Sequence, residues 1–208
     1  MTDVLLSAVG LTADLTRARD SDTGVHLDRV SGYARVIALD LARAISLPEG
    51  FVEDLTVLAS AHDVGKLAIP DHILLKQGPL SPSERTIMEG HVESGVVVVE
   101  DLIRAFGLGD SPRVAMLRNI VRSHHESLDG SGYPGRLRGD EIPLEARIVA
   151  VADVFDALTT ERPYKRTWTP EAALAFLVEH AGTRFDARCV SALERYWREE
   201  IGAGTRSS

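Results

Sequence analysis

Residues 146–158 read ARIVAVADVFDAL, an almost continuous apolar segment with the carboxylate of Asp153 in its middle. Such a segment is helical or buried, and a carboxylate inside it is costly to bury unless it is paired or ligates a metal. Elsewhere apolar residues recur at three- and four-residue steps, the spacing of one helical face, as in Val30, Ala34 and Ile37. No segment alternates with a two-residue period over a useful length. The sequence therefore predicts an all-α fold.

Capping residues and prolines predict where the helices begin and end. Residues 81–84, Ser-Pro-Ser-Glu, are typical of a capping box with proline in the first turn. Gly107 is expected to end the same helix after Phe106. Two loops rich in glycine and proline, 69–79 and 127–143, interrupt the helical pattern, and long ordered loops often carry function. The remaining predicted helices comprise a lead helix over 1–18, helices starting near Thr23, at Pro48 and at Pro112, a helix from Thr169 to Gly182, and a last helix over 186–197.

Length, charge and cysteine content limit the class of protein. The 208 residues suit one domain with a buried core. The 23 lysines and arginines against 31 acids give a net charge of −8, which disfavours a nucleic-acid polymer as partner because that needs a basic surface. One cysteine, Cys189, excludes an intrachain disulfide and a cysteine-rich zinc site. No apolar run approaches the ~20 residues that span a membrane, and no basic segment precedes residues 4–6. We therefore expect a single-domain cytoplasmic protein without membrane insertion.

Histidines and aspartates recur in separate apolar helical segments. A His-Asp pair alone is a weak motif, and a lone histidine such as His72 or His180 is more often a surface or core residue. The joint arrangement carries the weight, because imidazole and carboxylate donors without thiolates suit iron, manganese, cobalt or zinc. A carboxylate flanked by histidines can also bridge two cations. The candidate donors are His26, His62, Asp63, His91, His124, His125 and Asp153.

Six blocks in chain order resemble the HD-GYP family, a branch of the HD-domain metal-dependent phosphohydrolases. The resemblance covers about residues 19–190. It implies a compact multi-helix HD-domain bundle with a C-terminal helical extension, in which 1–18 is a lead helix, 19–200 is the HD-GYP core and 201–208 is a disordered tail. The blocks are HDVGK (62–66), IPD (69–71), HHE (124–126), DGSGYP (129–134), DVFDAL (153–158) and RPYK (162–165).

The resemblance also implies two or three divalent cations and hydrolysis of cyclic di-GMP to pGpG and, with a third cation, to GMP. Iron or manganese is expected, with zinc or another divalent ion as an alternative, and the attacking group is a hydroxide activated by the cations. Asp63 and Lys66 are the catalytic residues: Asp63 bridges the cations, and Lys66 clamps a phosphate and delivers a proton to the leaving oxygen. The implied ligands are His26, His62, Asp63 and Asp153 for the first cation, and Asp63, His91, His124 and His125 for the second.

Further residues are implied in binding the substrate. Arg162 and Lys165 contact phosphate or guanine, as expected of cationic donors. Asp156 orients these two side chains. Lys66, which clamps a phosphate, also belongs to the substrate-binding residues. Tyr133 supports the wall of the site or a surface for a partner protein. The expected partners are cyclic di-GMP and either a diguanylate cyclase (GGDEF) domain or a separate regulatory protein, and a homodimer is compatible with the sequence.

The sequence departs from the family pattern at a few positions. Asp22 stands one helical turn before His26, where trinuclear members place a glutamate and many binuclear members an aromatic residue. It is expected either to bind a third cation or only to cap a helix N-terminus. Ala68 replaces a usual glycine, and Gly135-Arg136 reverses the usual order, which leaves the local loop shape open. Two other functions stay open: an HD-type phosphohydrolase for another cyclic dinucleotide or nucleotide, and a catalytically weak sensor or adaptor.

Overall fold

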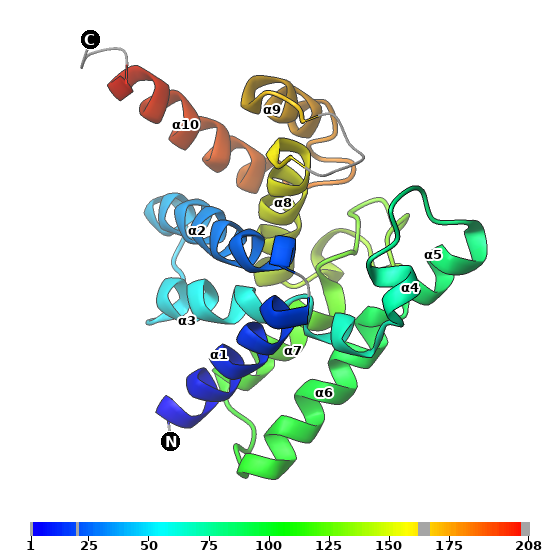
Figure 1. Cartoon of the computed structure of the whole chain (residues 1–208). Helices are drawn as coiled ribbons and strands as arrows, with labels where there is room; N and C mark the ends of the chain where they lie inside the picture. The colour runs from blue at the N-terminus through cyan, green and yellow to red at the C-terminus, as the bar shows by residue number, and fades with distance from the viewer. Residues whose placement is uncertain (1, 20, 162–166, 205–208) are drawn as a thin grey trace.

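Helices form almost all of the regular structure in a computed structural model of the chain, which describes residues 2–19, 21–161 and 167–204 (Figure 1). Within these ranges no residue belongs to a β-strand, so the all-α prediction is confirmed. The elements are α1 (Thr2–Arg19), α2 (Ser21–Ala44), α3 (Phe51–Leu58), η1 (Ala59–Ala61), η2 (Val64–Ala68), α4 (Asp71–Leu74), α5 (Pro82–Glu89), α6 (His91–Phe106), α7 (Pro112–Ser123), η3 (Gly139–Glu141), α8 (Leu144–Thr159), α9 (Pro170–Glu179) and α10 (Ala187–Gly204), where η marks a 3₁₀ helix.

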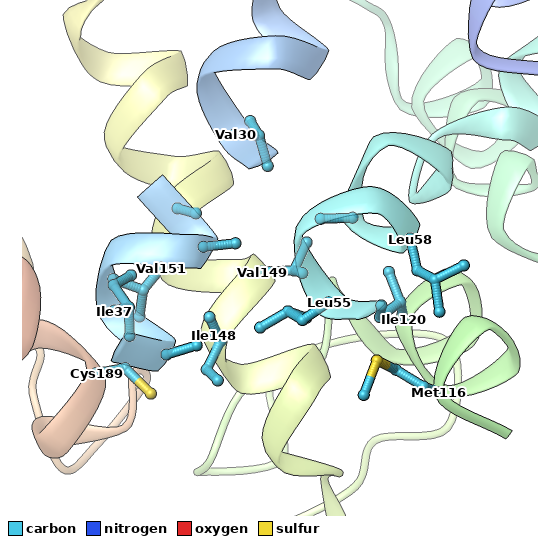
Figure 2. Packing of buried hydrophobic residues seen from close by; sticks show 14 of the residues in the cluster. Val30, Ile37, Leu55, Leu58, Met116, Ile120, Ile148, Val149, Val151 and Cys189 are labelled. Carbon is cyan, nitrogen blue, oxygen red and sulfur yellow. The ribbon is translucent and has the colours of Figure 1, made fainter. Parts of the chain in front are cut away.

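The hydrophobic core lies where α2 and α8 pack on each other and on α3, α7 and α10. Figure 2 shows side chains from these helices meeting in one cluster, among them Ile37 of α2, Leu55 of α3, Ile120 of α7 and Val149 of α8. All four are fully buried, and each contributes about 1.5–3 kcal/mol by leaving water. The helical stripe predicted in the second helix is therefore the face that α2 turns to the core.

The prediction of one continuous helix from Ser81 to Phe106 is wrong, because the helix breaks at Gly90 into α5 and α6. Its beginning is confirmed: the Ser81 hydroxyl accepts from the Glu84 amide, and the Glu84 carboxylate accepts from the Ser81 amide. Its end is confirmed as well, since Gly107 takes a left-handed φ of 60°. The break has a consequence for the site, because it makes His91 the first residue of α6.

The His-Asp pair lies on irregular backbone rather than on a regular α-helix. The helix predicted from Pro48 begins only at Phe51, after Gly50 with its positive φ of 76°. It ends at Leu58, and two short 3₁₀ segments, η1 and η2, carry the chain past residues 62–63. The tighter 3₁₀ winding changes the direction of successive side chains compared with an α-helix.

Two further helix ends differ from the prediction. α9 ends at Glu179, and Gly182, with its positive φ of 77°, follows in the turn after it. α10 continues past Trp197 to Gly204. Within the part of the chain that the structure describes, no helix combines the length and apolarity required to traverse a bilayer.

A close approach of backbones fixes η2 against α6. A Cβ added to Gly65 would lie 1.8 Å from the His91 carbonyl oxygen and 2.3 Å from the Gly95 amide nitrogen. Both atoms belong to the backbone, so they cannot turn aside as a flexible side chain would. This contact brings the segment after Asp63 directly against the first turns of α6, where His91 lies.

Gly65→Ala should therefore destabilise the fold. We expect the free energy of unfolding to fall by about 2 kcal/mol or more, because an overpacked contact between backbones must be relieved by moving η2. Gly10→Ala is the control, since an added Cβ there meets nothing within 4 Å and alanine is the better helix former by about 0.5–1 kcal/mol. Urea denaturation of both variants measures the difference; equal stabilities would contradict the close contact.

Candidate metal centre

Six of the seven predicted donor residues come together as two groups that share Asp63. Within each group the potential ligand atoms all lie within 4.8 Å of one another. The shared carboxylate is buried, with only 2% of the residue exposed. One group is His26, His62 and Asp63, and the other is Asp63, His91, His124 and His125.

Different elements bring these donors to one place. His26 lies in α2, and His91 is the first residue of α6. His124 caps the C-terminus of α7, and His125 follows it outside the helix. The sequence predicts a helix around each donor, whereas the structure places residues 62–63 and 124–125 where helices end. Helix ends allow neighbouring residues to face the same site, which a continuous helix does not.

Backbone carbonyls fix the orientation of three of the imidazoles. Nδ1 of His62 donates to the Ala59 carbonyl at 2.8 Å, Nδ1 of His91 to that of Met88 at 2.7 Å, and Nδ1 of His124 to that of Ile120 at 3.0 Å. A carbonyl can only accept, so Nδ1 carries the proton and Nε2 of each neutral ring presents a lone pair. Such bonds are typical of histidines that ligate metals.

The lone pairs that result are buried without protein partners. Among the described residues, Nε2 of His62, His91 and His124 and Oδ1 of Asp63 find no hydrogen-bond partner. Buried polar groups are nearly always satisfied, so four orphaned atoms around one point require an explanation. All four are electron-pair donors, and a cation satisfies them together. The donor set therefore fits divalent metal ions.

Asp153, from α8, lies beside the first group. Its Oδ1 is 3.4 Å from Nε2 of His26 and 3.9 Å from Nε2 of His62. The carboxylate predicted from the apolar segment thus faces the same space as the two imidazoles. Its position is consistent with the role of a fourth donor in that group.

Asp156 has a different environment from the one we expected. Its carboxylate is fully buried and accepts from Nδ1 of His26 at 2.7 Å and from Nε and Nη2 of Arg29 at 2.5 and 3.0 Å. Burial alone would raise the pKa of Asp156, but the bonds from His26 and Arg29 outweigh it and lower that pKa. Asp156 therefore orients the His26 ring.

Charge around Asp63 keeps the carboxylate ionised. Burial opposes ionisation, but the Lys66 ammonium, which donates to Oδ2 at 2.5 Å, and the His62 ring lower the pKa of Asp63 well below its ordinary range. Burial lowers the pKa of His91 to about 4 and that of His125 well below 6.5. Burial opposes protonation of His62 too, but Asp63 outweighs it and raises the pKa of His62. The shifts of Asp63, His91 and His125 therefore favour anionic carboxylate and neutral imidazole, the forms that bind metal.

The loop after His125 forms one wall of the site. The Tyr133 ring stacks on the His125 ring, with centroids 4.8 Å apart and an angle of 25° between the planes. The Glu126 carboxylate accepts from the amides of Gly135 at 2.6 Å and Leu137 at 3.0 Å, which holds the loop in place. Burial, followed by the Glu89 carboxylate, raises the pKa of Tyr133, so its hydroxyl stays neutral.

Sequence reasoning missed Arg29 and Glu126. Arg29 lies three residues after His26. A positively charged side chain one helical turn from a predicted ligand was the signal by which Arg29 could have been found. Glu126 follows the His-His pair directly. Three predicted residues lie outside what the structure describes: Arg162 and Lys165 altogether, and Asp22 in its side chain, although its backbone belongs to α2.

Comparisons with known proteins point to one family. The HD domain model matches residues 16–189. A cyclic di-GMP phosphodiesterase response regulator of Xanthomonas campestris pv. campestris is 45% identical over 177 residues, 85% of this chain and 44% of that protein. The 3′3′-cGAMP-specific phosphodiesterase 2 of Vibrio cholerae is 40% identical over 189 residues, 91% of this chain and 34% of that protein. The chain thus spans less than half the length of these relatives.

The fold is also found among solved structures. An HDG"Y"P protein from Bdellovibrio bacteriovorus aligns with a TM-score of 0.66 at 20% identity, covering 93% of this chain and 62% of that one. A cyclic GMP-AMP-specific phosphodiesterase from V. cholerae aligns with a TM-score of 0.62 at 22% identity, covering 94% and 48%. At these identities the likeness concerns the fold.

Asp156→Ala should destabilise the protein strongly, because it leaves the buried His26 ring and the Arg29 guanidinium without their acceptor. Removing one partner of a buried ion pair typically costs about 3–5 kcal/mol. Asp140→Ala is the matched control: this aspartate also pairs with an arginine, Arg147, but its side chain is 96% exposed, so the loss should stay below about 1 kcal/mol. Urea denaturation of both variants without added metal distinguishes the two; similar losses would mean that Asp156 is not the buried anchor described above.

Proposed function

The chain belongs to the HD-domain family, in its HD-GYP branch, and on this premise we propose that it is a metal-dependent phosphodiesterase that hydrolyses cyclic di-GMP. The observation that carries the proposal is the buried Asp63 carboxylate, shared by two groups of donors whose Nε2 and Oδ1 atoms lack protein partners. Relatives up to 45% identical that carry the same activity in their names support it.

We propose that two divalent cations bind here, with Asp63 contacting both. When bound, they would supply an activated water and neutralise charge on the phosphate. Imidazole and carboxylate donors suit iron or manganese, and zinc as well. His26, His62, Asp63 and Asp153 would hold one cation, and Asp63, His91, His124 and His125 the other.

Lys66 is assigned two roles beside the two proposed metal ions. Its ammonium lies 2.5 Å from Oδ2 of Asp63 and is partly exposed. From there it can reach a phosphate oxygen of a bound dinucleotide. It can also deliver a proton to the 3′-oxygen that departs as the P–O bond breaks.

Recognition of the dinucleotide is assigned to Arg162, Lys165 and Tyr133. The positively charged side chains of Arg162 and Lys165 suit a phosphate or the acceptor edge of guanine. Their assignment rests on the family resemblance. Tyr133, stacked on His125, offers an apolar wall. If Asp22 binds a third cation, the terminal phosphate of pGpG would bind and the final product would be GMP; if Asp22 only caps a helix, hydrolysis would stop at pGpG.

A second candidate substrate is 3′3′-cyclic GMP-AMP, because a relative named for that specificity is 40% identical over 91% of the chain. The test is incubation of the manganese- or iron-loaded protein with each cyclic dinucleotide, followed by chromatography of the products. Conversion of cyclic di-GMP to pGpG or GMP is expected. Hydrolysis of cyclic GMP-AMP alone would replace the first proposal by the second, and hydrolysis of neither would refute both.

Asp63→Ala should abolish binding of both cations, because each loses the anion that the two share. We expect elemental analysis to show little metal and chromatography to show no hydrolysis. Asp101→Ala is the control, since this aspartate lies on the surface beside Arg104 and its loss should change neither quantity. Full metal content with normal turnover in Asp63→Ala would rule out the shared carboxylate.

In the metal-loaded protein, where the cations would balance the charge of Asp63, Lys66→Ala should keep its metal and its fold but lose activity. Removing a charged phosphate contact or proton donor typically lowers the rate on the order of 10²-fold or more. Lys76→Ala removes a lysine that pairs with Glu84 on the surface and should behave like the wild type. If Lys66→Ala loses its metal, the residue is structural and the catalytic assignment is wrong.

A further inference from the structure

Arg19, the last residue of α1, reaches into the segment that follows the His-Asp pair. Its Nη1 donates to the carbonyls of Lys66, at 3.0 Å, and Leu67, and its Nη2 donates to the carbonyl of Ile69. Nε and Nη2 also donate to Oδ1 of Asp71, at 3.2 and 2.7 Å. One guanidinium thus binds three backbone carbonyls within four residues, 47 to 50 positions away in sequence.

The segment needs such a partner because it satisfies only part of its own carbonyls, among them that of Lys66, which accepts from the Ile69 amide at 3.1 Å. η2 has only five residues and ends at Ala68, and the next residue, Ile69, is extended with φ −77° and ψ 133°. Pro70 follows and has no amide hydrogen to donate. Carbonyls at the end of a short helix therefore depend on outside donors, and a planar arginine fork serves several at once.

The same segment is also fixed by α6. Gly65 lies against the backbone of His91 and Gly95 so closely that a Cβ would not fit. η2 therefore contacts both α6 and α1. Lys66 directly follows the contact at Gly65, its carbonyl accepts from Arg19, and its ammonium donates to Asp63.

We propose that Arg19 is a positioning residue for Lys66, acting through the backbone of residues 66–69. This inference rests on the proposed function, because it concerns the geometry of the group assigned to the phosphate. The ion pair with Asp71 is not what carries it: the Asp71 side chain is 71% exposed, and such surface pairs contribute little. The bonds to the carbonyls set where the Lys66 side chain begins.

The test compares four variants of the full chain. Arg19→Ala removes the fork, and Arg19→Lys keeps a positive charge but not the planar set of donors. Asp71→Asn removes only the charge of the exposed partner. Arg17→Ala is the matched control, because Arg17 lies on the same helix and pairs with the exposed Asp14 and Asp28.

Hydrogen exchange gives a readout that does not depend on activity. The amides of Lys66 and Ile69 donate to the carbonyls of Asp63 and Lys66 inside the clamped segment. In Arg19→Ala and Arg19→Lys both amides should exchange roughly tenfold faster or more, as expected for local opening after loss of such bonds. Amides of α8 should keep their rates, as should all amides in the two other variants.

Kinetic measurements then test whether the clamp, meaning the bonds from Arg19 to the carbonyls of Lys66, Leu67 and Ile69, positions Lys66. In both Arg19 variants we expect kcat to fall roughly 10- to 100-fold, since small misplacements of a catalytic group have effects of this size, with KM changed less and metal content unchanged. Unchanged exchange at Lys66 and Ile69 would overturn the clamp, and faster exchange with unchanged kcat would overturn its role for Lys66. If the wild type cuts no cyclic dinucleotide, the proposed function fails, and exchange alone decides the clamp.

Discussion

The buried carboxylate of Asp63 is the group around which the site is organised. Its oxygens lie 3.3 Å from Nε2 of His62 and of His91, and 3.8 Å from Nε2 of His124. A buried charge of this kind destabilises a fold unless it is paired, and here Lys66 partners it from the open side. The helices α2, α6, α7 and α8 are placed so that His26, His91, His124 and Asp153 lie around this one group.

Much of the fold could be predicted from the sequence, because the helices that form the core have a regular apolar period. The stripe of α2 and the capped starts of α5, α7 and α9 follow from local chemistry. The breaks do not. Gly90 lies inside an unbroken helical pattern, and the 3₁₀ winding around residues 62–63 depends on how η2 packs against α6. Tertiary contacts override propensity at these points.

The donor set could be predicted by residue type and by resemblance, whereas the residues that support it could not. Asp156 was expected to orient Arg162 and Lys165; in the structure it binds His26 and Arg29, 130 and 127 positions away in the chain. Arg19 is likewise joined to its carbonyls across 47–50 residues. No local pattern records such contacts. These supporting groups decide the orientation of the donors, which residue identity alone does not.

The central claim, that one buried carboxylate is shared by two cations, is tested most directly by anomalous diffraction from crystals of the manganese-loaded protein. The account predicts two anomalous peaks a few ångströms apart, consistent with the usual spacing of about 3.5–4 Å. Each should lie beside one oxygen of Asp63, one toward His26 and His62 and the other toward His91, His124 and His125. A single peak, or peaks that leave Asp63 out of contact with either ion, would contradict it.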